Sequence, residues 1–143
     1  MSVEIRIASL LRVATEDLAG AKMLAAAGNR NAVYLAEQSA EKIIRAVLTS
    51  ESIHPGIKHD LESMVSSIPD ANPLKPALRD IQHLKDYATA FRYPTQEGRI
   101  KPLPADVGES LAKVQAALEG ALARFGVDPE KPNSPATRPE PIR

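Results

Sequence analysis

An arginine flanked by aromatic residues is the strongest candidate for binding chemistry in this sequence. Arg92 lies between Phe91 and Tyr93, and Pro94 follows. A guanidinium at a helix terminus with aromatic neighbours can bind phosphate through two parallel hydrogen bonds and stack on a base. The same arginine would be stabilised by the negative end of the helix dipole without any ligand. Both interpretations stay open, and we treat Arg92 and Tyr93 as candidate ligand-binding residues.

The histidines offer weaker candidates. His59 precedes Asp60 at the predicted start of a short helix, where a side chain can cap unsatisfied backbone N–H groups. Capping is the simpler interpretation, and recognition of a phosphate or base by His59 is the alternative. Arg79, His83 and Asp86 share one face of a predicted helix, which a solvated helical surface explains more simply than a site does.

Several enzyme classes lack their sequence signatures. No serine lies in a Gly-x-Ser-x-Gly elbow, and the chain has neither a glycine-rich phosphate loop nor a His-Glu-x-x-His motif. With no cysteine and 3 histidines, few side chains remain for a transition-metal site. We therefore assign no catalytic residue and expect no metal and no cofactor.

Composition and charge indicate a single helical domain. The chain has 143 residues, 43% of them hydrophobic, and its 18 basic side chains balance 18 acidic ones. A neutral chain without a basic stripe is not expected to bind duplex DNA. No apolar run approaches the roughly 18 residues that a membrane span needs. We expect a cytoplasmic protein without a membrane partner.

Apolar residues recur at helical spacing through most of the chain. The spacing predicts helices over about 3–27, from Asn29 or Asn31 to a turn at 52–58, from 59 or 60 to 68, from about 76 to Tyr93, and from near Asp106 to Phe125. Gly28 and Gly126 are expected to end two of them in the left-handed conformation. Asp106 and Glu109 have capping-box spacing.

These helices predict an all-α fold, an antiparallel four-helix bundle with an additional short helix. The bundle is expected to span residues 1–126. We expect ten apolar side chains to be buried in its core: Leu11, Leu18, Ile43, Val47, Leu61, Leu78, Ile81, Leu84, Leu111 and Leu118. Residues 127–143 contain five prolines and little to bury, so we expect a disordered, proline-rich tail.

Several short segments, taken in order, resemble the HEPN (higher eukaryotes and prokaryotes nucleotide-binding) family. They span roughly residues 10–94 and are Glu16-Asp17-Leu18, Ala32-Val33-Tyr34, Gln38-Ser39-Ala40-Glu41-Lys42, His59-Asp60-Leu61, and Tyr87 through Arg92-Tyr93-Pro94. The resemblance implies a helical bundle that forms a homodimer. It also implies pairing with a minimal nucleotidyltransferase, because many bacterial members form toxin–antitoxin pairs of this kind. The ligand-binding residues that it favours here are Arg92, Tyr93, His59, Tyr87 and Lys42.

The ribonuclease motif of this family is missing from the chain. Members that cleave RNA without metal have an Arg followed after four to six residues by His. Only three residues separate Arg79 from His83, and no histidine follows Arg92. Because histidine usually supplies the general base or acid, the leading hypothesis is a module that binds a nucleotide, RNA or a partner. The alternatives are a ribonuclease toxin with a divergent active site and a non-catalytic dimeric assembly module. Packing in the core is the simpler interpretation of Tyr87.

Overall fold

The structure is a computed structural model that describes residues 2–54, 56, 60–91 and 102–142. Within those residues it contains helices and no strand, so the predicted all-α class is confirmed. The helices are α1 (Val3–Ala26), α2 (Asn31–Ser50), α3 (Leu61–Ser66), α4 (Lys75–Arg79), α5 (Leu84–Ala90) and α6 (Pro104–Phe125).

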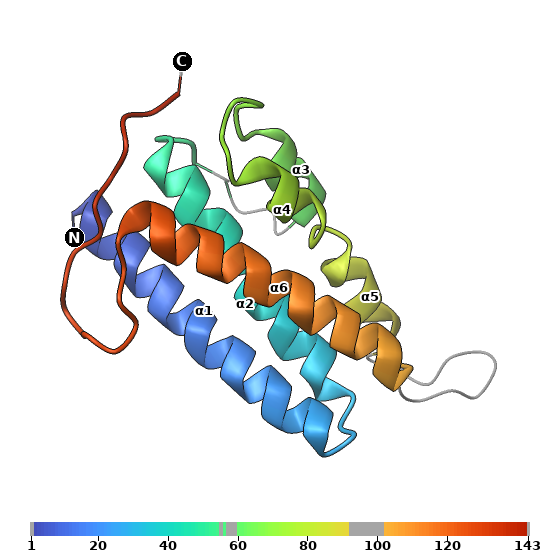
Figure 1. The fold of residues 1–143 in the computed structure, drawn as a ribbon. Helices are drawn as coiled ribbons and strands as arrows, with labels where there is room; N and C mark the ends of the chain where they lie inside the picture. Colours follow the sequence, from blue (N-terminus) through green and yellow to red (C-terminus); the bar gives the residue numbers. More distant parts are fainter. Residues whose placement is uncertain (1, 55, 57–59, 92–101, 143) are drawn as a thin grey trace.

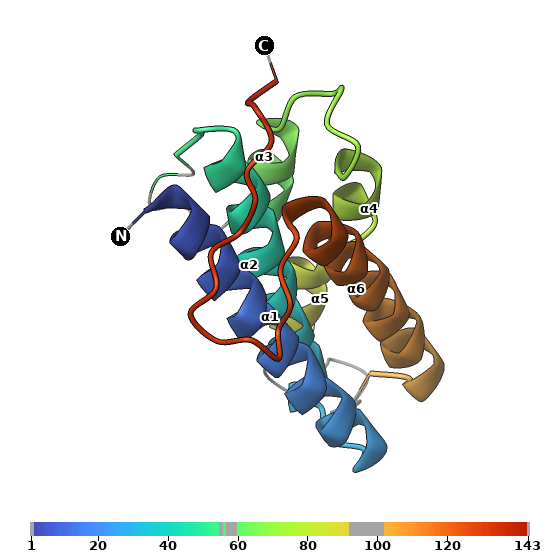
Figure 2. The ribbon, with the colours of Figure 1, turned by 60° about the vertical axis from the view of Figure 1, so that its left-hand side comes forward.

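Helix α2 is the central element of the fold. It packs against α1, α3, α5 and α6, and α4 packs against α3 and α6. Figures 1 and 2 show α1, α2 and α6 side by side, with α1 running antiparallel to the other two. The first half of α1 therefore lies beside the second half of α2. This pairing brings together residues that are about forty positions apart in the sequence.

Small residues let α1 and α2 approach closely. Ser39 in α2 donates its hydroxyl hydrogen to the carbonyl oxygen of Ala14 in α1 over 2.8 Å, and both residues are buried. A β-carbon added at Gly20 would lie 3.0 Å from Cδ1 of Leu35, which is closer than ordinary packing allows. The close contact fixes the register of the two helices, and this register sets the surface residues on both.

The predicted core is confirmed. All ten side chains named above are buried, with Leu111 the most exposed at 8%. Asp60 caps α3 through a hydrogen bond from the Glu62 N–H to its carboxylate, so of the two predicted starts Asp60 is the one observed. Gly28 and Gly126 have φ angles of 67° and 58°, so the predicted left-handed helix ends are also confirmed.

Two predictions about the helices are wrong. The single helix predicted from about 76 to Tyr93 is interrupted between α4 and α5, because Ile81 and Leu84 donate to carbonyls three residues back rather than four. This tighter turn leaves Ile81 and Leu84 both fully buried. The three residues predicted to share one helical face are thus separated: Arg79 ends α4, His83 precedes α5 and Asp86 lies within α5. The predicted capping box is also absent, since α6 begins at Pro104 and Asp106 lies in its first turn.

Residues 127–142, which we call the C-terminal strap, lie against the bundle. Figure 1 shows this segment turning back from the end of α6 and running past the start of α1. The Ala136 N–H donates to the Glu4 carbonyl over 3.0 Å, and Arg12 donates to the carbonyls of Lys131 and Ser134 over 2.6 and 2.7 Å. The strap is thus held against α1 by hydrogen bonds between Arg12 and its backbone oxygens and between its own Ala136 N–H and Glu4.

Candidate functional site

A groove of about 580 Å³ runs between the first half of α1 and the second half of α2. This volume lies within the range that small-molecule sites occupy. The α1–α2 groove, as we call it, is lined by apolar side chains, basic side chains, an imidazole and hydroxyls: Val3, Leu10, Val13 and Ile53; Arg6, Lys42 and Arg45; His54; Ser9, Thr49 and Ser52. Among the residues that the structure describes, no carboxylate belongs to this lining.

Helical spacing explains how these side chains reach one surface. Arg6, Leu10 and Val13 follow one another at steps of four and three along α1. Lys42, Arg45 and Thr49 do so at steps of three and four along α2. Residues three and four apart on a helix are neighbours on its surface. The two stripes therefore face each other across the groove.

The floor of the groove is apolar and partly open to solvent. Leu10 and Ile53 are half-buried, and Val13 is 40% exposed although it is a large hydrophobic side chain. Ile53 follows the end of α2, where its N–H donates to the Leu48 carbonyl over 2.9 Å. A ligand with a flat apolar body could bury these side chains further.

Basic groups line the groove on both helices. The Lys42 ammonium contacts the Asp17 carboxylate at 2.8 Å and donates to Gln38 Oε1 over 3.3 Å. Arg45 forms an ion pair with Glu41 at 3.6 Å within α2. Arg6 and His54 are exposed. The carboxylates of Asp17 and Glu41 hold the two α2 cations in place but do not line the cavity. An anion could therefore approach Lys42 and Arg45 from the groove.

The adjacent side of α2 carries the contrary charge. A smaller recess of about 280 Å³ between α2 and α5, the α2–α5 recess, is lined by Glu37, Glu41, Lys85 and Tyr34 together with Gln38, Ala88 and Thr89. Burial raises the pKa of Glu37 above its usual value, and the neighbouring Glu41 raises it further. The hydrogen bond from Gln38 and the charges of Lys85 and Lys42 oppose this rise. A negatively charged ligand is therefore disfavoured on this side.

The structure places two of the five predicted ligand-binding residues. Lys42 lines the α1–α2 groove. Tyr87 instead lines a separate recess between α5 and α6, and its ring meets that of Phe91 edge to face at 5.2 Å. The other three residues, Arg92, Tyr93 and His59, lie outside the described residues. The two placed residues therefore belong to different cavities and do not form one site.

Sequence reasoning missed Arg6, Arg45 and His54 as members of a site. Arg45 lies three positions after Lys42, and this spacing on α2 was the available signal. The contribution of α1 depends on the register between two helices, which the sequence pattern does not specify. The groove thus becomes visible only when the antiparallel pair is assembled.

Comparison with models of known protein families shows the family of this chain. The model of the HEPN domain matches residues 7–131 of the 143-residue chain. The chain belongs to the HEPN family. The matched range extends beyond the resemblance at residues 10–94 and includes α6, so it covers the helices of this HEPN domain except the first four residues of α1. Membership supports a nucleotide- or RNA-related role in general terms. No curated protein and no solved structure gives a significant match.

The described part of the HEPN domain offers no group of three or more histidine or carboxylate side chains that could hold a metal ion. None of the helices among these residues has the length and apolar character required to span a bilayer. The α1–α2 groove is lined by cations, an imidazole and apolar side chains. This combination suits an anionic ligand with an apolar portion.

Proposed function

We propose that this HEPN domain is a binding module for a nucleotide or a short single-stranded RNA, and that the α1–α2 groove receives it. Arg6 and Arg45 bind phosphate, since a guanidinium can donate two parallel hydrogen bonds to phosphate oxygens. The base or sugar lies on the apolar floor at Leu10, Val13 and Ile53. This proposal moves the ligand-binding role from the end of α5 to the α1–α2 pair.

One observation carries the proposal. On a chain whose formal net charge is zero, three cationic side chains and an imidazole surround an apolar groove that is lined by no carboxylate of the described residues. Hydrogen bonds to charged groups contribute about 1.5–3 kcal/mol each, so a few such contacts give measurable affinity. Balanced overall charge limits unspecific attraction to long nucleic acid, which favours a small or short ligand.

The test is titration of the full chain with AMP and with a short oligouridylate, followed by calorimetry and fluorescence anisotropy. Arg6→Ala should weaken binding about tenfold because one charged hydrogen bond is lost. It should also reduce the slope of log K against log salt concentration by about 0.7 for a single-stranded ligand. Arg79→Ala is the matched control, because Arg79 is an exposed arginine on α4 outside the groove.

Equal affinity of the wild type and Arg6→Ala would show that the ligand does not bind in the α1–α2 groove. Equal weakening by Arg6→Ala and Arg79→Ala would show an unspecific charge effect. Arg92→Ala belongs in the same series, since the sequence favours Arg92 as a ligand-binding residue. If only Arg92→Ala abolished binding, the site would lie at the end of α5 and not between α1 and α2.

The partner proposals are that this HEPN domain forms a homodimer and that it pairs with a minimal nucleotidyltransferase in a toxin–antitoxin system. The support for both is the family resemblance of the sequence. Light scattering of the purified chain tests the first. Co-expression with a minimal nucleotidyltransferase from the same genome tests the second, and separate elution of the two proteins would contradict it.

A second candidate function is metal-independent RNA cleavage. The observation that favours it is His54, which lies in the α1–α2 groove with Arg6 and Arg45. An imidazole can exchange a proton with an attacking ribose hydroxyl or a leaving group. The candidate predicts cleavage in EDTA that His54→Ala abolishes. Intact RNA after prolonged incubation with the wild type would exclude it.

A further inference from the structure

Three helices of this protein end with the same hydrogen-bond pattern. After α1, α2 and α6, one residue adopts the left-handed conformation and the next donates its N–H to a carbonyl five residues back: Asn29 to Leu24, Ile53 to Leu48 and Val127 to Leu122, at 2.9, 2.9 and 3.0 Å. This is the Schellman motif. The motif normally places glycine at the left-handed position because glycine has no β-carbon.

The end of α2 departs from the other two. Glycine occupies the left-handed position after α1 and α6, at Gly28 and Gly126, whereas Ser52 occupies it after α2 with a φ of 60°. A residue with a β-carbon is sterically disfavoured there. Ser52 also lines the α1–α2 groove, and Ile53 and His54 follow it in the same lining. The disfavoured conformation thus lies in the groove wall.

Arg138 of the C-terminal strap binds this helix end. Its Nε donates to the Ser50 carbonyl over 3.0 Å, and its Nη2 donates to the Ser52 hydroxyl oxygen. Ser50 ends α2, which has no basic residue in its own last turn. A cation at this position satisfies a terminal carbonyl and interacts favourably with the helix dipole.

A second strap contact anchors the same helix end. The Ile142 N–H donates to Glu51 Oε2 over 2.9 Å, and Glu51 is only 8% exposed. The other carboxylate oxygen of Glu51 accepts a hydrogen bond from Asn72 Nδ2 over 3.3 Å. Three consecutive residues of the chain, Ser50 to Ser52, therefore accept hydrogen bonds from the strap.

We propose that Arg138 is a positioning residue for the α1–α2 groove: it holds Ser52 in the left-handed conformation and so fixes the wall formed by Ser52, Ile53 and His54. The strap stabilises the left-handed residue after α2, whereas after α1 and α6 a glycine adopts this conformation without such support. Residues 132–142, which include Arg138, lie outside the range that the family model matches. The strap therefore stabilises the end of α2 from outside the matched part of the HEPN domain. The effect on ligand affinity rests on the proposed function, whereas the effect on the helix end does not.

Amide hydrogen exchange tests the role of Arg138 without any ligand. Arg138→Ala should accelerate exchange of the Ile53 amide about tenfold, the factor expected when a hydrogen bond from a charged donor is lost. The Asn29 amide, which closes the equivalent motif after α1, should not change. Arg138→Lys keeps the charge with fewer donors and should give an intermediate rate. Arg79→Ala should leave both amides at wild-type rates.

A double-mutant cycle separates this role from a general stabilising one. In a Ser52→Gly background the left-handed conformation no longer needs external support, so adding Arg138→Ala should accelerate Ile53 exchange far less than in the wild type. Equal acceleration in both backgrounds would overturn the proposal, as would unchanged exchange in Arg138→Ala alone.

Titration with the short oligouridylate gives the second readout. Arg138→Ala should weaken binding several-fold, and Ser52→Gly should restore affinity to Arg138→Ala. Faster Ile53 exchange with unchanged affinity would overturn the link between the strap and the groove. If the wild type itself did not bind the oligouridylate, the proposed function would fail, and the exchange cycle would still decide whether Arg138 holds the helix end.

Discussion

The two sides of helix α2 differ in charge and in the size of the cavity, which is about 580 Å³ towards α1 and about 280 Å³ towards α5. Towards α1 it presents Lys42 and Arg45 beside exposed apolar side chains, and towards α5 it presents Glu37 and Glu41 beside Tyr34. Glu41 connects the two sides because its carboxylate pairs with Arg45 at 3.6 Å. A chain with zero net charge can therefore carry one surface suited to anions and another that repels them.

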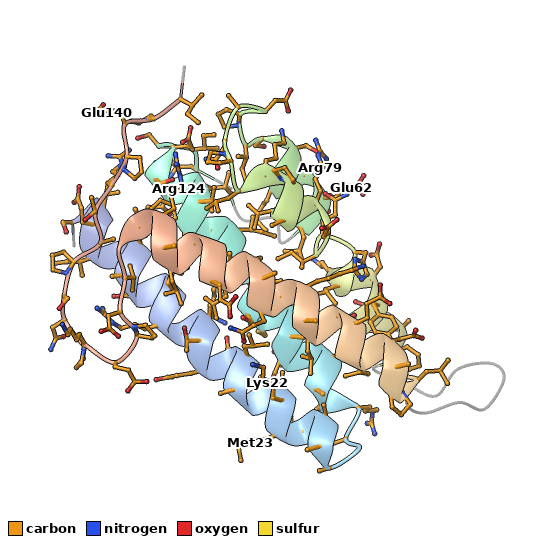
Figure 3. The ribbon with its side chains drawn as sticks, in the orientation of Figure 1. Lys22, Met23, Glu62, Arg79, Arg124 and Glu140 are labelled. Carbon is orange, nitrogen blue, oxygen red and sulfur yellow. The ribbon has the colours of Figure 1, made fainter. Side chains whose placement is uncertain are left out.

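Figure 3 shows that side chains of several kinds project from the remaining surface as well, so charge alone does not mark a site. Lys22, for example, donates to Gln115 Oε1 over 2.6 Å and joins α1 to α6, while Met23 beside it points away from the bundle with 75% of its surface exposed. The α1–α2 groove differs because its cations surround a concave apolar surface. We take concavity and charge together as the feature that distinguishes the two sides of α2.

The largest expected effect comes from removing the core that supports both sides. Ile43 lies in the same helix, α2, on its core-facing side, and is fully buried. Ile43→Ala should lower the free energy of unfolding by about 2–5 kcal/mol, and Ile43→Val by about 0.5–1.5 kcal/mol. Urea denaturation measures both. A loss below 1 kcal/mol for the alanine variant would show that α2 is not packed as described.

Reversing one charge on each side tests their difference directly. Lys42→Glu should weaken oligouridylate binding more than about tenfold, because a cation of the groove lining is replaced by a carboxylate that repels the phosphates. Lys85→Glu places the same change in the α2–α5 recess and should leave affinity within about twofold, since this recess receives no ligand in our account. Fluorescence anisotropy compares them, with urea denaturation to confirm that both variants fold. Similar losses in the two variants would erase the distinction between the sides.

The smallest effect concerns the pH dependence of the acidic side. Because burial raises the pKa of Glu37, its neutral form is favoured in the folded state. The stability that this group contributes is present below its ordinary pKa of 4.5 and is lost as pH rises through the raised folded-state value. Glu37→Gln should therefore be more stable than the wild type at neutral pH, and the difference should shrink as pH falls.

Thermal unfolding across this pH range measures the difference. Glu16→Gln is the control, because Glu16 is exposed on α1 and its replacement should change stability little. A Glu37→Gln variant that was less stable than the wild type at neutral pH would contradict the effect of burial.

Local pattern was sufficient for most of the fold. The apolar stripes predicted all ten named core residues, and Gly28 and Gly126 marked two helix ends. The break between α4 and α5 was not predictable because Asp80 to His83 contain no proline or glycine to signal it. The contacts of the strap were not predictable for a related reason: its composition contains little to bury, whereas many of its contacts are hydrogen bonds of Arg12, Arg138 and backbone N–H groups.

The site was less predictable than the fold because it depends on pairs of residues distant in sequence. Lys42 was anticipated from a family segment, but Arg6 joins it only through the antiparallel register of α1 and α2. Tyr87 was placed with Lys42 by resemblance, and the structure puts it in another recess. Arg92, Tyr93 and His59 lie outside the described residues, so their role stays a prediction from sequence.

The most direct test of the central claim is a methyl and amide NMR titration of the wild-type chain with the short oligouridylate. Our account predicts that signals from Leu10, Val13 and Ile53 shift on binding, while those from Ala88 and Thr89 in the α2–α5 recess do not. Shifts confined to the α2–α5 recess, or to residues outside the α1–α2 groove, would contradict it.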